Sequence, residues 1–207
     1  INTVPTIANV AVTSSETGYY NSSILTCAAT VNDPDQHNTI VYAWSSSTGL
    51  ALTNTSTVDL STEALLPTDT LTCTVDVTDN DDGTSISQTE TVVIDNRPPS
   101  VPTVEITWSG NGLFAMEGDA LTCTASASID PDGESVSYSY SWLSTVSGPS
   151  TGQTIAGTYT FDGDTWTCLV SATDGTDATT GTDSASITSL CNLCLLYTSP
   201  SPRDLST

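Results

Sequence analysis

The stretch Leu25-Thr26-Cys27-Ala28-Ala29-Thr30 returns in the second half of the chain as Leu121-Thr122-Cys123-Thr124-Ala125-Ser126. A second cysteine follows each copy within another shared stretch, Asp69-Thr70-Leu71-Thr72-Cys73 and Asp164-Thr165-Trp166-Thr167-Cys168. A tryptophan follows the first cysteine of each copy at a similar distance, Trp44 in the first copy and Trp142 in the second. Landmarks that recur in one order and at nearly one spacing indicate two copies of a single domain.

The segment Asp95-Asn96-Arg97-Pro98-Pro99-Ser100 separates the two copies. Its prolines fix backbone dihedrals and lack N–H donors, so we expect a short, stiff connector. We predict a first repeat over residues 1–96 and a second over residues 97–190, and the chain reads as a slice of a longer array. We predict an artefactual, unstructured tail over residues 191–207, because the run from Cys194 to Asp204 resembles a translated sequencing adapter. Whether Cys191 is authentic stays open.

Within each copy, short runs alternate between apolar and polar residues or are continuously apolar, and they are rich in Val, Ile, Thr and Tyr. Gly, Asn, Asp and Pro separate these runs at intervals of about ten residues, which is typical of a β-sandwich. In the first repeat we expect strands over residues 7–12, 23–29, 40–44, 57–65, 70–77 and 85–94. In the second repeat, the stretch from Ser137 to Trp142 carries its aromatic residues on one face, which predicts an inward Trp142.

The patterns Cys27…Trp44…Cys73 and Cys123…Trp142…Cys168 resemble the framework of immunoglobulin-like domains. The resemblance covers residues 1–190 and implies an all-β fold of two tandem immunoglobulin-like Greek-key β-sandwiches, about seven strands each. It also implies that strands B and F carry the disulfides, Cys27–Cys73 and Cys123–Cys168, with the strand C tryptophan packed against them.

In its Thr-rich strands and Asp-Pro-Asp-Gly turns, the chain is similar to bacterial surface arrays of immunoglobulin-like, PKD-like and cadherin-like repeats. One feature departs from the antibody-type domain. The tyrosine expected two residues before the second cysteine is replaced by Leu71 in the first repeat and by Trp166 in the second.

The cysteines also indicate the cellular compartment. A zinc site is disfavoured, because His37 is the one histidine and is not near a cysteine, and because the Cys191-Asn192-Leu193-Cys194 motif spans the adapter junction. Disulfides persist in oxidising surroundings and predict an extracellular or cell-surface protein. The alternative is a set of reduced cysteines buried in the two cores.

Charge excludes several classes of partner. The chain has 2 Lys plus Arg against 24 Asp plus Glu, a formal net charge of −22. This balance excludes the basic footprint of a nucleic-acid-binding protein and disfavours anionic lipid surfaces. No apolar run approaches the roughly 18 residues of a membrane-spanning helix.

The sequence offers little for catalysis, so we predict that the protein is not an enzyme. His37 lies in a polar turn, Asp35-Gln36-His37-Asn38, and the serine-rich stretches lack a Gly-x-Ser-x-Gly motif. The many carboxylates lie in polar turns, whereas an acid–base pair needs a pocket that separates the two pKa values.

Oxygen ligands for a metal are more plentiful. We expect no required cofactor. Ca²⁺ is the candidate ion, because it binds six to eight carboxylate, carbonyl and water oxygens. The B–C and F–G loops of an immunoglobulin-like sandwich lie at the same end. The candidate ligands are Asp33, Asp35, Asp79, Asp81, Asp95, Asn96, Asp130, Asp132 and Asp174, with Asn32, Asp69, Asp82, Glu134 and Asp177 beside them. Asp95 and Asn96 would add to the site of the second repeat, in a segment that is similar to the end of the cadherin inter-repeat linker. The alternative is that these residues only favour turns.

Three functions fit these features. The first is a structural and adhesive spacer in a long extracellular protein, in contact with neighbouring repeats of its own chain. The second is a carbohydrate- or protein-binding module of a secreted enzyme, with Trp108 and Phe114 as a platform for a glycan. The third is a self-associating subunit of an extracellular filament or phage tail, which would use exposed sheet edges.

Overall fold

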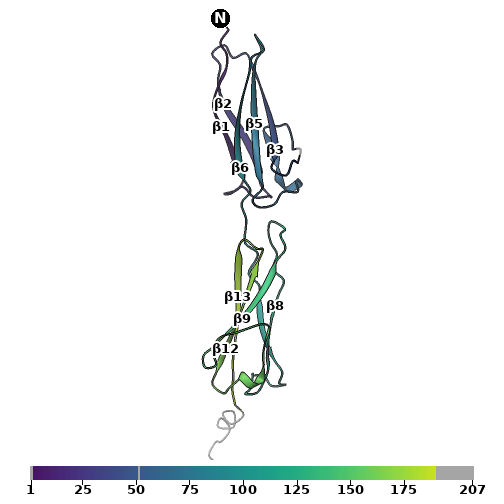
Figure 1. The fold of residues 1–207 in the computed structure, drawn as a ribbon, viewed down its shortest axis with the longest axis vertical. Helices are drawn as coiled ribbons and strands as arrows, with labels where there is room; N and C mark the ends of the chain where they lie inside the picture. Colours follow the sequence, from purple (N-terminus) through teal and green to yellow (C-terminus); the bar gives the residue numbers. More distant parts are fainter. Residues whose placement is uncertain (1, 51, 190–207) are drawn as a thin grey trace, which may run out of the picture. The chain divides into compact units, whose positions relative to one another are not determined.

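The computed structural model describes residues 2–50 and 52–189. The chain divides between Arg97 and Pro98 into two compact units, where the sequence pattern placed the division after Asn96 (Figure 1). The predicted tail over residues 191–207, including Cys191, lies outside the described residues.

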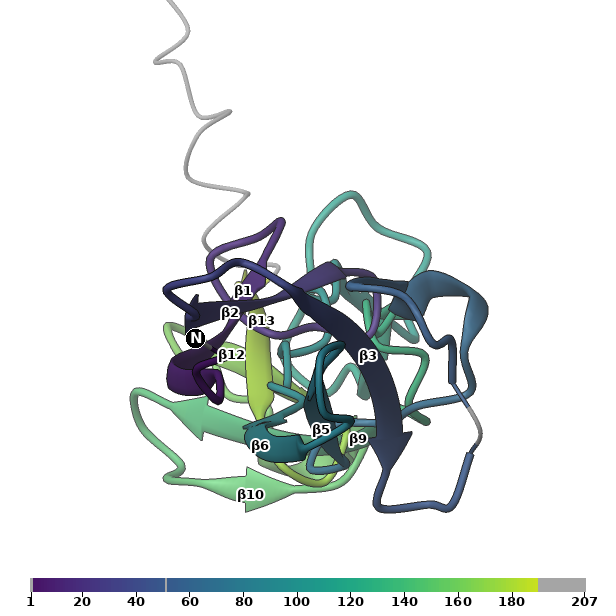
Figure 2. The ribbon, with the colours of Figure 1, turned by 90° about the horizontal axis from the view of Figure 1, so that it is seen from above.

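The first unit consists of two three-stranded antiparallel sheets. One sheet has the order β1-β2-β4, with strands Thr6–Ser14, Ile24–Asn32 and Thr57–Asp59. The other has the order β3-β5-β6, with strands Asn38–Ser46, Thr70–Asp79 and Ser85–Val93. Seen from above, β1 and β2 lie together on one side of this unit, and β5 and β6 lie on the other (Figure 2).

The second unit repeats this arrangement with one additional short strand. One sheet has the order β11-β8-β7, with strands Thr154–Ile155, Leu121–Ala125 and Val104–Trp108. The other has the order β10-β9-β12-β13, with strands Ser150–Thr151, Ser137–Ser144, Thr165–Thr173 and Ala178–Ser186.

The sheet orders identify both units as immunoglobulin-like Greek-key sandwiches, since strands A, B and E form one sheet and strands C, F and G form the other. Strands A, B and E are β1, β2 and β4 in the first unit and β7, β8 and β11 in the second; strands C, F and G are β3, β5 and β6 in the first unit and β9, β12 and β13 in the second. The predicted all-β class is therefore confirmed. In the described residues the first unit has six named strands and the second has seven. The difference arises after strand C. There Ser150 pairs with Trp142 in the second unit, whereas in the first unit Trp44 donates from its backbone N–H to the Thr53 carbonyl at 3.4 Å and from its indole N–H to the Thr55 carbonyl at 3.0 Å.

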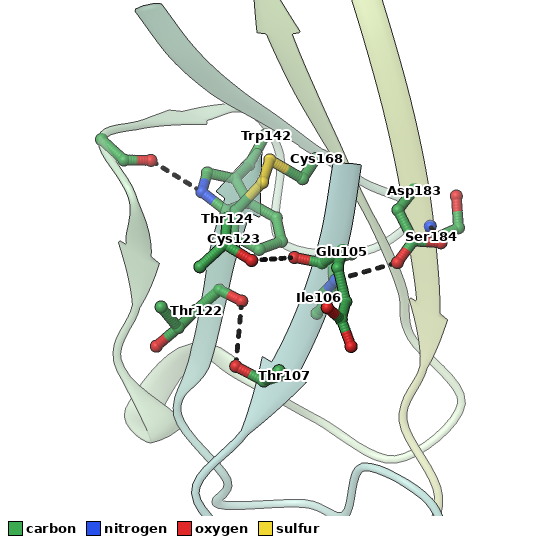
Figure 3. The surroundings of a disulfide bond; sticks show 11 residues. Glu105, Ile106, Thr107, Thr122, Cys123, Thr124, Trp142, Cys168, Asp183 and Ser184 are labelled. Atoms are coloured by element: carbon green, nitrogen blue, oxygen red, sulfur yellow. Dashed lines mark hydrogen bonds between the residues drawn. A yellow bond between two sulfur atoms is a disulfide. The ribbon is translucent and has the colours of Figure 1, made fainter. Parts of the chain in front are cut away.

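Each core is built around a disulfide and a tryptophan. The structure contains both expected disulfides, Cys27–Cys73 and Cys123–Cys168, each with a Cα–Cα distance of 6.4 Å. Trp142 is fully buried beside the second disulfide, and its indole N–H donates to the carbonyl of Gly152 at 2.8 Å (Figure 3). This burial confirms the inward orientation predicted for Trp142. The hydrogen bond to Gly152 satisfies the polar atom of the buried indole.

Two local details differ from the sequence-based expectations. The strand expected over residues 57–65 stops at Asp59, because this carboxylate accepts hydrogen bonds from Ser61 N–H at 3.0 Å and Ser61 Oγ at 2.6 Å and caps a short 3₁₀ helix, η1, Leu60–Thr62. In the second unit Trp166, at the position of the missing tyrosine, packs edge-to-face on Trp142, with ring centroids 6.2 Å apart. A second 3₁₀ helix, η2, spans Gly157–Tyr159.

Among the residues that the structure describes, no helix has the length and apolar character needed to cross a membrane.

Candidate functional site

The strand register of the second unit brings its B–C and F–G loops to one end of the sandwich. Strand β9 pairs with β12 up to Ser137 and Thr173, and β12 pairs with β13 up to Thr173 and Ala178. Residues 126–136 and 174–177 therefore leave the sheets at the same edge, and the acidic residues of both loops are held close to one another.

Three carboxylates meet at this end: Asp130, Glu134 and Asp174. One oxygen from each lies within 4.8 Å of the others. Only 7 % of Asp130 is exposed. Its Oδ1 accepts hydrogen bonds from the backbone N–H groups of Asp132 at 2.8 Å and Glu134 at 3.3 Å. Its buried Oδ2 has no hydrogen-bond partner. The Oε2 of Glu134 is likewise buried without a partner.

Electrostatic repulsion acts within this cluster. Burial raises the pKa of Glu134 above its ordinary value, and the neighbouring charges of Asp174, Asp130 and Asp132 raise it further. Residues 98–189 contain no lysine, arginine or histidine that would balance these charges. The site therefore favours a cation supplied from solution, or a proton.

The matching end of the first unit is also acidic, but its side chains are engaged differently. Asp33 Oδ2 accepts from the side-chain amide of Asn38 at 2.6 Å, and Asp35 Oδ2 accepts from the Thr3 backbone N–H at 2.9 Å. Asp79 is 2 % exposed, and its Oδ1 accepts from the backbone N–H of Asp81 at 2.8 Å. Asp33 Oδ1 and Asp79 Oδ2 are buried without partners, so this end resembles the second unit in part.

His37 and Asp81 form an ion pair across the two loops of the first unit. His37 Nδ1 lies 2.6 Å from Asp81 Oδ1, and the backbone N–H of Asn80 donates to the His37 carbonyl at 2.8 Å. The hydrogen bond and the charge of Asp81 raise the pKa of His37, aided by the charges of Asp79 and Asp35. The one histidine of the chain therefore lies at this acidic end, where Asp81 favours its protonated form.

We expect Asp81→Asn to return the pKa of His37 towards the ordinary histidine value of about 6.5. Because the folded pKa is raised, the pair stabilises the fold fully below the ordinary pKa and loses this effect as the pH rises through the folded value. Titration of the imidazole by NMR measures the shift directly. Asp82→Asn is the matched control, since Asp82 Oδ1 accepts from Thr84 N–H instead. An unchanged His37 titration in the Asp81 variant would contradict the pairing.

The remaining candidate ligands lie elsewhere in the first unit. Asp95 Oδ2 accepts from the backbone N–H of Tyr19 at 2.8 Å, and the Asp69 carbonyl accepts from Ile94 N–H at 2.8 Å. These residues and Asn96 are at the end of the first unit opposite to Asp33 and Asp79. Metal ligation by Asp95 and Asn96 stays a prediction.

Glu134 is the third carboxylate of the cluster in the second unit. The sequence pattern had instead indicated Asp132 as a ligand, with Glu134 beside it. The turn explains the presence of Glu134 in the cluster. Gly133 adopts a positive φ of 83°, and Glu134 follows directly after it. The sequence signal was the Asp-Pro-Asp-Gly-Glu run, in which a glycine precedes an acidic residue.

The aromatic pair Trp108 and Phe114 lines a shallow groove at the start of the second unit. The indole N–H of Trp108 donates to the Gly112 carbonyl at 3.1 Å, and Phe114 is 56 % exposed. The groove is completed by Ile106, Ala115 and residues 183–186. The two aromatic residues therefore contribute to one surface, as a glycan platform requires.

Comparisons with known proteins give matches to solved structures alone: no family model and no curated protein matches the chain. The FN1–FN3 domains of chicken CNTN1 align over 88 % of this chain and 67 % of their own length, with 11 % identity and a TM-score of 0.33. The three N-terminal domains of the bacteriophage RB49 highly immunogenic outer capsid protein align over 89 % and 59 %, with 18 % identity and a TM-score of 0.31. The full ectodomain of mouse nectin-like molecule 4 aligns over 88 % and 65 %, with 14 % identity and a TM-score of 0.29. The chain thus spans about two thirds or less of each structure.

Proposed function

We propose that the two repeats are structural, adhesive spacers of a long extracellular or cell-surface protein, of the kind found in bacterial arrays of immunoglobulin-like, PKD-like or cadherin-like repeats. The observation that carries the proposal is the duplication itself. One disulfide-linked sandwich occurs twice, and the two units follow one another directly at Arg97 and Pro98. Repetition of one unit through a short connector lengthens a protein.

The chemistry of the chain supports an exported location and a role without catalysis. Both disulfides require an oxidising compartment in order to persist. The net charge of −22 favours solubility, and it repels other acidic surfaces. His37, the residue best suited to proton transfer near neutral pH, is engaged by Asp81 at an exposed loop.

A single-molecule pulling experiment on the two-repeat chain tests the spacer function. We expect two separate unfolding events, one for each unit. The disulfides close loops with sequence separations of 46 and 45 residues, so these segments stay short under force. Reduction should lengthen each event by about 150 Å, because an extended residue spans roughly 3.3–3.6 Å. A single event, or lengths that reduction does not change, would contradict the proposal.

A binding function is the second candidate, and the groove beside Trp108 and Phe114 is the observation that favours it. Exposed aromatic surface that recognises a sugar would give saturable binding on a glycan array, and Phe114→Ala would remove that binding. Concentration-dependent fibres would instead identify a filament or phage-tail subunit. A monodisperse monomer that binds no glycan supports the spacer.

A further inference from the structure

We propose that the second repeat binds one Ca²⁺ ion through Asp130, Glu134 and Asp174, and that Glu134, at the position of His37 in the first repeat, is the residue that distinguishes the two repeats. This inference goes beyond the spacer function. It rests on the cluster geometry, on an unsatisfied buried carboxylate, and on a comparison of equivalent residues within the chain.

The dimensions of the cluster fit a calcium ion. Calcium binds oxygen ligands at about 2.3–2.6 Å, so two ligands on opposite sides of one ion lie about 5 Å apart. The carboxylate oxygens of Asp130, Glu134 and Asp174 lie within 4.8 Å of one another. One ion among the three oxygens would therefore be within reach of all three carboxylates.

The buried carboxylate of Asp130 points to a ligand independently of this clustering. Asp130 is 7 % exposed, and its Oδ1 is used by the backbone N–H groups of Asp132 and Glu134. Its Oδ2 is buried and has no hydrogen-bond partner. A buried carboxylate oxygen that has neither a hydrogen bond nor a counter-charge is unfavourable. A divalent cation supplies that charge and also engages the partnerless Oε2 of Glu134.

The first repeat has a different residue at the position of the third ligand, Glu134. Its run Asp33-Pro34-Asp35-Gln36-His37 matches Asp130-Pro131-Asp132-Gly133-Glu134, and Asp79 matches Asp174. The turn is the same in both repeats, since Gln36 and Gly133 both have positive φ, at 55° and 83°. Position 37, however, carries an imidazole that pairs with Asp81 at 2.6 Å. An imidazole engaged by Asp81 therefore replaces the carboxylate that the second repeat offers.

Among residues 2–50 and 52–189, the cluster of the second repeat is the one group of three acidic, histidine or cysteine side chains with this spacing. The equivalent pair in the first repeat, Asp33 and Asp79, retains one buried, partnerless oxygen on each residue. The first repeat therefore has counterparts of Asp130 and Asp174, and it lacks a carboxylate at the position of Glu134.

Calorimetric titration of CaCl₂ into the chelator-treated two-repeat protein, at about 0.15 M salt to screen diffuse charge, tests the proposal. We expect one binding event per chain. Asp130→Asn should weaken it at least tenfold, because the amide oxygen still accepts from the Asp132 and Glu134 N–H groups while the charge is lost. Glu134→Gln should weaken it similarly and leaves the buried aspartate intact, in case Asp130→Asn fails to fold.

Glu117→Gln is the matched control, since Glu117 is an exposed carboxylate in the A–B loop at the opposite end of the second unit. It should change the affinity less than twofold. Absence of binding in the unmodified protein overturns the site. Equal losses in Glu117→Gln and Glu134→Gln also overturn it, because they show diffuse attraction to negative charge.

An exchange of the distinguishing residue tests the second half of the proposal. Glu134→His should abolish the binding event, and His37→Glu should raise the stoichiometry from one ion to two. A stoichiometry of one in His37→Glu overturns the assignment of residue 37 as the deciding position. The pulling experiment on the spacer function has a different readout, so failure of either proposal is recognised separately.

Discussion

Replacement of both Cys123 and Cys168 by alanine is expected to lower the free energy of unfolding of the second unit by about 4 kcal/mol, from the chain-entropy model for a loop of this size. The two residues are 45 apart in sequence and are fully buried beside Trp142. Without the crosslink, the unfolded chain gains the freedom that the closed loop removed. Two alanines also remove sulfur atoms that fill space between the two sheets.

Denaturant titration measures this loss. The second unit should unfold at lower denaturant concentration than the first, which splits one transition into two or widens the interval between them. The double alanine variant of Cys27 and Cys73 is the matched control and should reverse the order of unfolding. Alkylation of the four cysteines in the native protein without reductant would refute the disulfides, and with them the argument for an exported protein.

The sequence predicts the frame of each unit because that frame depends on residue type and spacing alone. The alternation of apolar residues in β5 is sufficient to bury Leu71, Cys73, Val75 and Val77 on one face, and the structure shows this pattern without interruption. The inward position of Trp142 follows from the same period of two. These features need no knowledge of the loops.

The loops could be predicted only in outline, since their geometry depends on which oxygen a particular N–H reaches. The end of β4 at Asp59 is set by two hydrogen bonds from Ser61, and nothing in the apolar pattern of residues 57–65 indicates them. The position of Glu134 depends on the positive φ of Gly133. The sequence predicts that the acidic loops lie at one end of each unit. It does not predict that Glu134, rather than Asp132, lies beside Asp130 and Asp174.

Asp164 shows the same limit and leads to the second large effect. It matches Asp69 of the first repeat, and both residues end the turn before strand F. Asp164 is fully buried and accepts hydrogen bonds from Ser144 Oγ at 2.9 and 2.7 Å, Thr145 Oγ1 at 2.8 Å and Val146 N–H at 3.2 Å. Asp69 is partly exposed, and its carboxylate accepts from Leu66 N–H at 2.9 Å.

We expect Asp164→Ala to destabilise the second unit by about 3 kcal/mol, because several buried donors lose a charged acceptor at once. Asp69→Ala, the matched control, should cost about 1 kcal/mol, as is usual for one partly exposed hydrogen bond. Denaturant titration of the two variants gives both values. Equal losses would show that the donors around Asp164 find other partners.

The same residue predicts a loss of stability in acid. Burial of Asp164 acts to raise its pKa, but the hydrogen bonds from Ser144, Thr145, Val146 and Ser147 outweigh burial and hold the pKa below the ordinary value. The folded state therefore binds its proton less readily than the unfolded chain. The stabilisation is complete above the ordinary aspartate pKa of about 4 and is lost as the pH falls through the lower, folded value. Unfolding of Asp164→Asn between pH 6 and pH 3 should show a weaker pH dependence than the unmodified protein; an identical slope would exclude Asp164 as a source of acid sensitivity.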